Sequence, residues 1–178
     1  HPDLPHGEIY ICFVPDEEIG LCGAKNMDFS KFLVDFAYTI DCCAQGELVY
    51  QTFNAASAWL DITGVTAHPM SSKNNTVNPI LIAVDFINLL DRGETPEHTE
   101  KTEGYIWVQG IEGNQLTTRV KLNIRDHNRE KFLAKKEYLQ ACTDMMRKRY
   151  PKAKLELTIR DEYGNINDAI TPENRKCV

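Results

Sequence analysis

Two apolar runs near the start of the chain have the pattern of buried strands. Residues 9–14, IYICFV, are apolar throughout, and residues 36–40, FAYTI, are nearly so. Continuous β-prone runs of this length are typical of strands covered on both faces of a parallel sheet. The pattern predicts two strands of an α/β domain within residues 1–48.

From about residue 46 the pattern changes to alternation, and then to helical spacing. Residues 55–63 alternate apolar and polar positions, which predicts a strand with one buried face, formed by Ala56, Ala58, Leu60 and Ile62. Residues 77–90 predict a helix whose buried stripe contains Ile80, Ala83, Val84 and Ile87.

The second half of the chain predicts two more strands, a long helix and a final strand. The strands at 105–111 and 117–125 flank the turn-rich sequence EGNQ. Residues 128–149 predict a helix capped by Asp126, with a buried stripe of Phe132, Leu139, Cys142 and Met146. Alternation at 155–159 predicts the last strand, after Pro151.

The order of these elements over residues 55–160 is βαββαβ. This order is that of the ferredoxin-like unit, an antiparallel sheet with two helices on one face. We therefore expect an α+β fold in three parts. Residues 1–48 form part of an α/β domain, residues 49–162 form the ferredoxin-like module, and residues 163–178 return to the first part.

Composition narrows the class of protein. The net charge of -6, without a basic run, argues against a nucleic-acid partner. No apolar stretch approaches the ~20 residues that span a bilayer, so no membrane partner is expected. The six cysteines show no CxxC pair, which favours reduced thiols in a cytoplasmic protein.

Three acidic residues follow the predicted buried strands. Glu17 and Glu18 come after the first run and Asp41 after the second. Ligands of α/β sheets bind beyond the carboxyl ends of strands, so the three carboxylates can converge. Converging carboxylates repel each other unless a cation is present, and a divalent metal resolves this conflict. The alternative is a solvated acidic turn before a helix, where glutamates suit the helix dipole.

Several motifs carry a family resemblance. In order they are PHGEIYICFVPDEEIG, FAYTIDCC, GELVYQTFNAAS, TAHP and IRDHNRE, and the match that they belong to runs from about residue 6 to residue 163. The chain thereby resembles the peptidase T family, tripeptide aminopeptidases among the co-catalytic zinc exopeptidases. The resemblance implies a two-zinc catalytic domain with an inserted ferredoxin-like lid. It implies that Glu17 is the general base, that Glu18 binds one zinc ion and that Asp41 binds the other.

The resemblance also assigns three residues of the lid to the substrate. His68 in TAHP matches a histidine that reaches the substrate or oxyanion, often in the partner subunit's site. Arg125 in IRD matches an arginine for the substrate carboxylate, and Asn78 corresponds more loosely to an asparagine of the lid. The alternatives are an ordinary loop histidine and a solvated arginine, paired with Asp126.

The sequence departs from the family in ways that affect function. Cys42 and Cys43 replace a Gly-Gly pair, and residues 70–73 replace a Gly-rich loop, which leaves substrate preference open. The other metal ligands of the family, two histidines and a bridging aspartate, have no counterpart here. We therefore expect an internal part of a longer enzyme, which by itself is inactive and does not bind its two zinc ions stably.

Two other function classes remain open at this point. One is a related dizinc carboxypeptidase or deacylase, and the other is a non-catalytic ferredoxin-like binding or dimerisation domain. The expected partners are a short peptide substrate and a second copy of the chain, bound through the lid.

Overall fold

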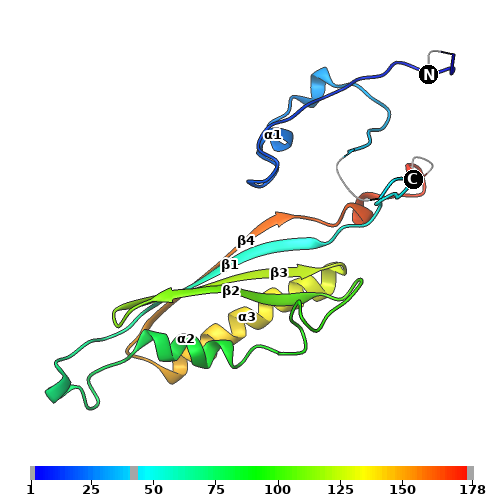
Figure 1. Cartoon of the computed structure of the whole chain (residues 1–178). Coiled ribbons are helices and arrows are strands. Elements are labelled where there is room, and N and C mark those ends of the chain that lie inside the picture. The colour runs from blue at the N-terminus through cyan, green and yellow to red at the C-terminus, as the bar shows by residue number, and fades with distance from the viewer. Residues whose placement is uncertain (1–2, 41–43, 176–178) are drawn as a thin grey trace. The chain divides into compact units, whose positions relative to one another are not determined.

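The computed structural model describes residues 3–40 and 44–175 of the chain (Figure 1). The chain divides into two compact units, His1–Leu48 with Asn174–Val178 and Val49–Glu173. Among the described helices, none is long and apolar enough to cross a membrane.

The larger unit contains four strands and two main helices. In chain order they are β1 (Asn54–Thr63), α2 (Pro79–Ile87), β2 (Tyr105–Gly113), β3 (Thr117–Asp126), α3 (Arg129–Arg149) and β4 (Lys154–Tyr163). Short 3-10 helices, η2 (Pro69–Ser71) and η3 (Ile166–Ala169), lie in the loop before α2 and after β4.

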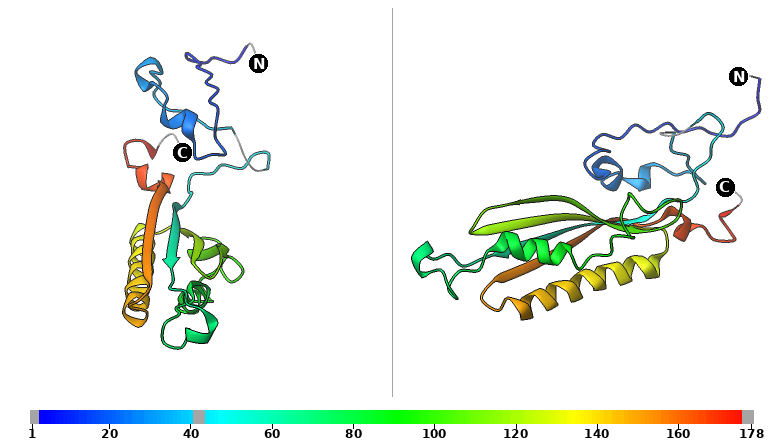
Figure 2. Two further views of the ribbon diagram at one scale, coloured as in Figure 1. Left: turned by 90° about the vertical axis from the view of Figure 1, so that its left-hand side faces the viewer. Right: turned by 60° about the horizontal axis from the view of Figure 1, so that its bottom comes forward.

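The four strands form one antiparallel sheet in the order β2-β3-β1-β4. Both helices cover the same face, as the two views of Figure 2 show, and the other face carries no helix of this unit. The predicted ferredoxin-like βαββαβ arrangement is therefore confirmed.

The core lies between the sheet and the helices. The predicted buried positions of β1 are fully covered, as are Val120, Leu122 and Ile124 on the facing strand β3. The predicted stripe of α3 is also confirmed, since Phe132, Leu139, Cys142 and Met146 are all buried.

The buried stripe of α2 differs from the prediction. The residues that face the sheet are Pro79, Ile82, Ala83 and Phe86, whereas Val84 is exposed. Nearly every position of this helix is apolar, so the sequence is compatible with several stripes. Packing against the sheet selects the one that contains Phe86, the largest side chain of the helix.

The predicted cap of α3 was also wrong. Asn128 is the N-cap, and its side-chain oxygen accepts a hydrogen bond from the backbone N–H of Lys131 at 2.9 Å. Asp126 is the last residue of β3, and its Oδ1 accepts from the backbone N–H of Asn128 at 2.9 Å. The aspartate thus holds the turn that precedes the helix.

The smaller unit contains α1 (Cys22–Lys25) and the 3-10 helix η1 (Phe29–Lys31), and the predicted strands at 9–14 and 36–40 do not form. Their apolar side chains are exposed, for example those of Phe13 and Ile40. A strand buried on both faces needs neighbouring strands and covering helices. The described part of residues 1–48 supplies neither, so the apolar pattern alone did not produce a sheet.

Candidate substrate-binding face and acidic turn

The uncovered face of the sheet carries cations that are paired with nearby carboxylates. Arg119 donates to both carboxylate oxygens of Asp61, its partner across β1 and β3, at 2.6 and 2.8 Å. These hydrogen bonds lower the pKa of Asp61. Three other pairs of this kind are Lys121 with Glu112, Lys154 with Glu156 and Arg160 with Glu162.

Arg125, near the end of β3, is a cation without such a partner. It lies opposite Ala55 of β1 and Tyr105 of β2. Its guanidinium carbon is 4.4 Å from the centroid of the Phe53 ring, and its Nε is buried without a hydrogen-bond partner. No carboxylate in residues 3–40 or 44–175 pairs with it. This permanently charged donor is therefore available to an external anion.

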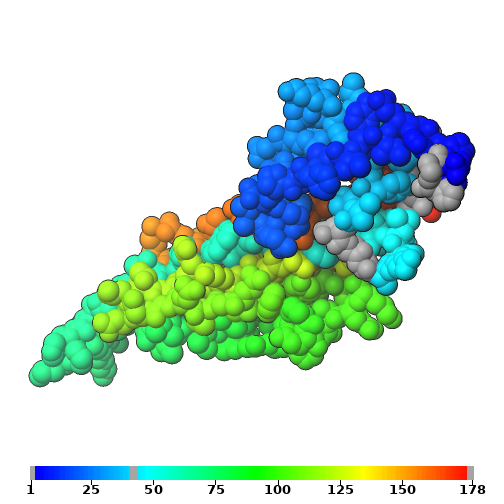
Figure 3. Space-filling view, turned by 45° about the horizontal axis from the view of Figure 1, so that its top comes forward, coloured from blue at the N-terminus to red at the C-terminus, as the bar shows by residue number. Residues whose placement is uncertain are grey.

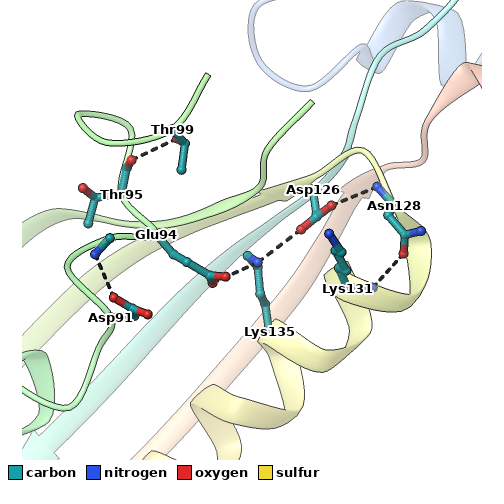
Figure 4. Close-up of polar contacts among 9 residues, drawn as sticks. Asp91, Glu94, Thr95, Thr99, Asp126, Asn128, Lys131 and Lys135 are labelled. Atoms are coloured by element: carbon teal, nitrogen blue, oxygen red, sulfur yellow. Dashed lines mark hydrogen bonds and ion pairs between the residues drawn. The ribbon is translucent and has the colours of Figure 1, made fainter. Parts of the chain in front are cut away.

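The neighbouring Asp126 is engaged on the opposite side of the sheet (Figure 4). Its side chain is 1% exposed, and its Oδ2 forms an ion pair with Lys135 Nζ of α3 at 3.2 Å. The same nitrogen lies 2.9 Å from Glu94 Oε2 in the loop before β2. Burial lowers the pKa of Lys135, but the contacts with Glu94 and Asp126 outweigh it and raise the pKa overall. The alternative interpretation, an Arg125–Asp126 pair, is therefore wrong.

His68 is the N-cap residue of η2, in the loop between β1 and α2. This loop projects at the lower left of the space-filling view (Figure 3). The base of this loop is closed by the bridge between Val65 and Val77. The His68 side chain caps η2, because its Nδ1 accepts a hydrogen bond from the backbone N–H of Met70 at 3.3 Å. A neutral ring with Nδ1 as acceptor carries its proton on Nε2. The exposed imidazole therefore presents an N–H donor to its surroundings.

Asn78 has a structural role in the same region. Its side-chain oxygen accepts a hydrogen bond from the backbone N–H of Ile80 at 3.0 Å and so caps α2. The side-chain NH₂ group makes no hydrogen bond within the described residues. The predicted contact of Asn78 with the substrate would therefore be made by its NH₂ group.

His68 and Arg125 do not come together within one copy of the chain. Arg125 pairs with Ala55 near the start of β1, whereas the loop with His68 leaves from Thr63, the last residue of that strand. Eight residues of strand separate the two positions, or roughly 27 Å at ~3.4 Å per residue. A tripeptide is too short to reach both.

Glu17 and Glu18 lie in a tight turn before α1. The carbonyl of Glu17 accepts backbone hydrogen bonds from Gly20 at 3.1 Å and Leu21 at 2.9 Å. Asp16 and Leu21 have left-handed backbone conformations, with φ of 58° and 59°. Aspartate adopts this conformation readily, but it is costly for leucine, and such strained residues are concentrated at functional sites. Both glutamate side chains are exposed and have no hydrogen-bond or ionic partner within the described chain.

Of the three predicted acidic residues, the structure describes Glu17 and Glu18. Asp41, Cys42 and Cys43 lie outside the described residues. Within residues 3–40 and 44–175, no group of three metal-ligating side chains comes together. The described residues thus do not assemble a zinc site by themselves. Glu18 as a ligand and Glu17 as a base stay predictions.

Sequence reasoning missed three residues around Arg125, namely Phe53, Asn54 and Asn165. The ring of Phe53 stacks on the guanidinium of Arg125. The two buried asparagines form hydrogen bonds with backbone groups next to Phe53 and next to Arg125. Two of them lie within the motif GELVYQTFNAAS. The available signal was Asn54, which precedes a run of small residues in the sequence. Its partner, the carbonyl of Asp126, could not be identified without the register of β1 and β3.

Comparison with known proteins agrees with the fold. Residues 50–154 match the model of the M20 peptidase dimerisation domain. A peptidase T-like protein of Yersinia pestis is 50% identical over 170 residues, 96% of this chain and 42% of the relative. A peptidase T of Fusobacterium nucleatum is 41% identical over 170 residues, 96% of this chain and 41% of the relative. The chain thus spans about two fifths of these relatives.

Two solved structures are similar to the chain at 22% identity. A tripeptidase of Staphylococcus aureus matches with a TM-score of 0.73 over 84% of this chain and 40% of its own. An aminopeptidase PepT of Bacillus cereus matches with a TM-score of 0.71 over the same shares. At this level of identity the likeness establishes the fold.

Proposed function

Since the chain belongs to the M20 peptidase dimerisation domain family, we propose that it forms the lid and part of the catalytic domain of a zinc-dependent aminopeptidase. The enzyme would release N-terminal residues from tripeptides. The names of the full-length relatives support this activity. The free thiols of Cys12, Cys22 and Cys142 support a cytoplasmic location.

The observation that carries the proposal is the unpaired guanidinium of Arg125. A carboxylate can accept two parallel charge-assisted hydrogen bonds from a guanidinium. A short peptide carries such a group at its C-terminus. Arg125 on the lid would therefore bind the end of the substrate that is not cleaved, and so favour short peptides.

The acidic turn supplies the second part of the proposal. Glu17 would act as the base and Glu18 as a metal ligand, with Asp41 as a ligand of the second metal ion. When bound, zinc would lower the pKa of a water molecule and polarise the peptide carbonyl. The unpaired, exposed carboxylates on a strained turn support these roles.

Kinetics of the full-length enzyme test both parts. Arg125→Ala should reduce kcat/KM for tri-alanine, and the corresponding loss of transition-state stabilisation should be about 2–4 kcal/mol. The same variant should change kcat/KM for tri-alanine amide little. Equal effects on the two substrates would show that Arg125 does not bind the carboxylate. Glu17→Gln should reduce kcat about a hundredfold or more with metal content unchanged, whereas Glu18→Gln should lose metal.

A blocked substrate separates this function from the alternatives. N-acetylation of tri-alanine should abolish cleavage by an aminopeptidase, since the free amine is then missing. A carboxypeptidase or deacylase would accept the acetylated peptide. A non-catalytic domain would cleave neither tri-alanine nor its acetylated form.

We also propose a homodimer formed through the lid. The sheet has two edges, β2 and β4. The sequence of β4, KLELTIRDEY, is dense in charges, whereas that of β2, YIWVQGIEG, contains only Glu112. Charged edge strands resist pairing with other strands, so β2 is the edge suited to a second copy.

The distance between His68 and Arg125 supports a site shared between two subunits. If His68 acts in the partner's site and Arg125 in its own, mixing His68→Ala and Arg125→Ala subunits leaves one intact site in each mixed dimer. Random exchange should then recover about a quarter of wild-type activity. No recovery would show that each site takes both residues from the same subunit.

A further inference from the structure

Arg125 is held in one orientation by its surroundings. The guanidinium carbon lies 4.4 Å from the centroid of the Phe53 ring, within the range of a cation–π contact. Nε is buried and has no hydrogen-bond partner, whereas neither terminal nitrogen is among the buried unpaired atoms. The edge formed by Nη1 and Nη2 is therefore the one that a ligand can reach.

The ring of Phe53 is fixed by its own neighbours. His127 packs edge-on at a centroid distance of 5.8 Å, and Tyr163 packs at 5.7 Å. Tyr163 and Arg125 lie on either side of Ala55, which is buried although it is on the uncovered face. The small alanine leaves room for the two large side chains to approach Phe53 from both sides.

The backbone around Phe53 is fixed by two buried asparagines. Thr52 N–H donates to Asn165 Oδ1 at 3.0 Å, and Asn54 Nδ2 donates to the carbonyl of Asp126 at 3.1 Å. Asn165 Nδ2 also donates to the carbonyl of His127 at 3.0 Å. These bonds join the segment before β1 to the residues that directly follow Arg125. Phe53 and Arg125 are thereby held against each other.

We propose that Phe53 is a positioning residue for substrate binding. It would hold the guanidinium of Arg125 so that the Nη1–Nη2 edge alone meets the substrate carboxylate, end-on. This inference rests on the proposed function of Arg125 and adds the orientation of the contact. An arginine ordered before binding loses less conformational entropy when the ligand arrives.

The stacking can be tested without enzyme activity, by NMR of arginine Nε–H groups in the 178-residue chain, with Arg125→Lys to assign the signal. The ring current of Phe53 should shift the Arg125 Nε–H signal upfield, and burial should slow its exchange with water. Phe53→Leu should remove both effects, and Phe53→Tyr should keep them. An unchanged signal in Phe53→Leu, or fast exchange in the wild type, would overturn the proposal.

The effect on substrate is tested in the full-length enzyme. Phe53→Leu should reduce kcat/KM for tri-alanine about tenfold, equivalent to ~1.4 kcal/mol and mainly through KM, with little change for tri-alanine amide. Phe53→Tyr should restore the rate. Phe132→Leu is the matched control, since this buried ring does not contact Arg125, and it should affect both substrates alike.

The two proposals can fail separately. If Arg125→Ala acts selectively on tri-alanine but Phe53→Leu does not, the positioning role is wrong and the function of Arg125 stands. If Arg125→Ala affects acid and amide equally, the carboxylate contact is wrong, and end-on binding falls with it. The NMR measurement then still decides whether Phe53 orders the arginine.

Discussion

Replacing Lys135 by methionine should be the most informative perturbation of the lid. Lys135 Nζ lies between Asp126, at 3.2 Å, and Glu94, at 2.9 Å. The Asp126 side chain is 1% exposed, whereas that of Glu94 is 50% exposed. Methionine matches the aliphatic stem of lysine but removes its charge. The variant therefore leaves a buried carboxylate with only the Asn128 N–H as a partner.

The expected loss of folding stability follows from the difference in burial between Asp126 and Glu94. Removing one partner of a buried ion pair costs about 3–5 kcal/mol. Glu94→Gln disturbs the solvent-exposed pair and should cost about 1 kcal/mol or less. The double variant Asp126→Asn, Lys135→Met removes both buried charges and should be more stable than Lys135→Met alone, since only the exposed Glu94 then lacks its partner.

Urea unfolding of the 178-residue chain, followed by far-UV circular dichroism, measures these differences. In the wild type the pKa of Lys135 is raised, so its contribution is complete below the unfolded value of ~10.4 and is lost as the pH rises through the folded value. If Lys135→Met lowers the free energy of unfolding no more than Glu94→Gln does, the charge of Lys135 is not needed to stabilise the buried carboxylate of Asp126.

Four further outcomes are expected. Asp61→Asn should cost up to about 1 kcal/mol at pH 7 in urea unfolding, and this cost should shrink as the pH falls below ~3.9, since the pKa of Asp61 is lowered in the fold and its contribution is lost as the pH falls through the folded value. Asn78→Ala should lower stability by ~1 kcal/mol through the lost cap, and Asn78→Asp should not. Ile111→Glu on the β2 edge should weaken dimerisation in analytical ultracentrifugation, and Thr158→Glu on β4 should not. Calorimetric titration of the 178-residue chain with zinc should show no submicromolar binding of two equivalents, because a normal site needs more ligands than it supplies.

The module was predictable from sequence because its patterns are local. Alternation in β1 and β3, and the spacing of Phe132 to Met146, each identify one element and its buried face. The stripe of α2 was not predictable, since a helix that is apolar on most sides is oriented by its partner. The apolar runs in residues 1–48 failed for the same reason, because a doubly buried strand depends on neighbours that its own sequence does not encode.

The candidate site was predictable only in part. Arg125 could be placed on the uncovered face from alternation alone, and the structure agrees. Alternation also places Asp126 on the opposite face, but its partner Lys135 could not be predicted, because that residue lies on α3 and the position of the helix on the sheet is not encoded locally. The roles of Phe53 and Asn165 depend on contacts between segments far apart in the sequence, up to 113 residues for Thr52 and Asn165.

The loop before β2 has an uneven tolerance to mutation as a consequence of Gly104. A β-carbon built on this glycine would lie 2.0 Å from Asp126 Oδ2 and 2.6 Å from the carbonyl oxygen of Arg125. The backbone there is not left-handed, so alanine is excluded by contact rather than by conformation. In a library that samples every substitution, position 104 should accept glycine alone, while the exposed Glu97 should accept most residues. A loop that is polar by composition thus contains a position as restricted as any in the core.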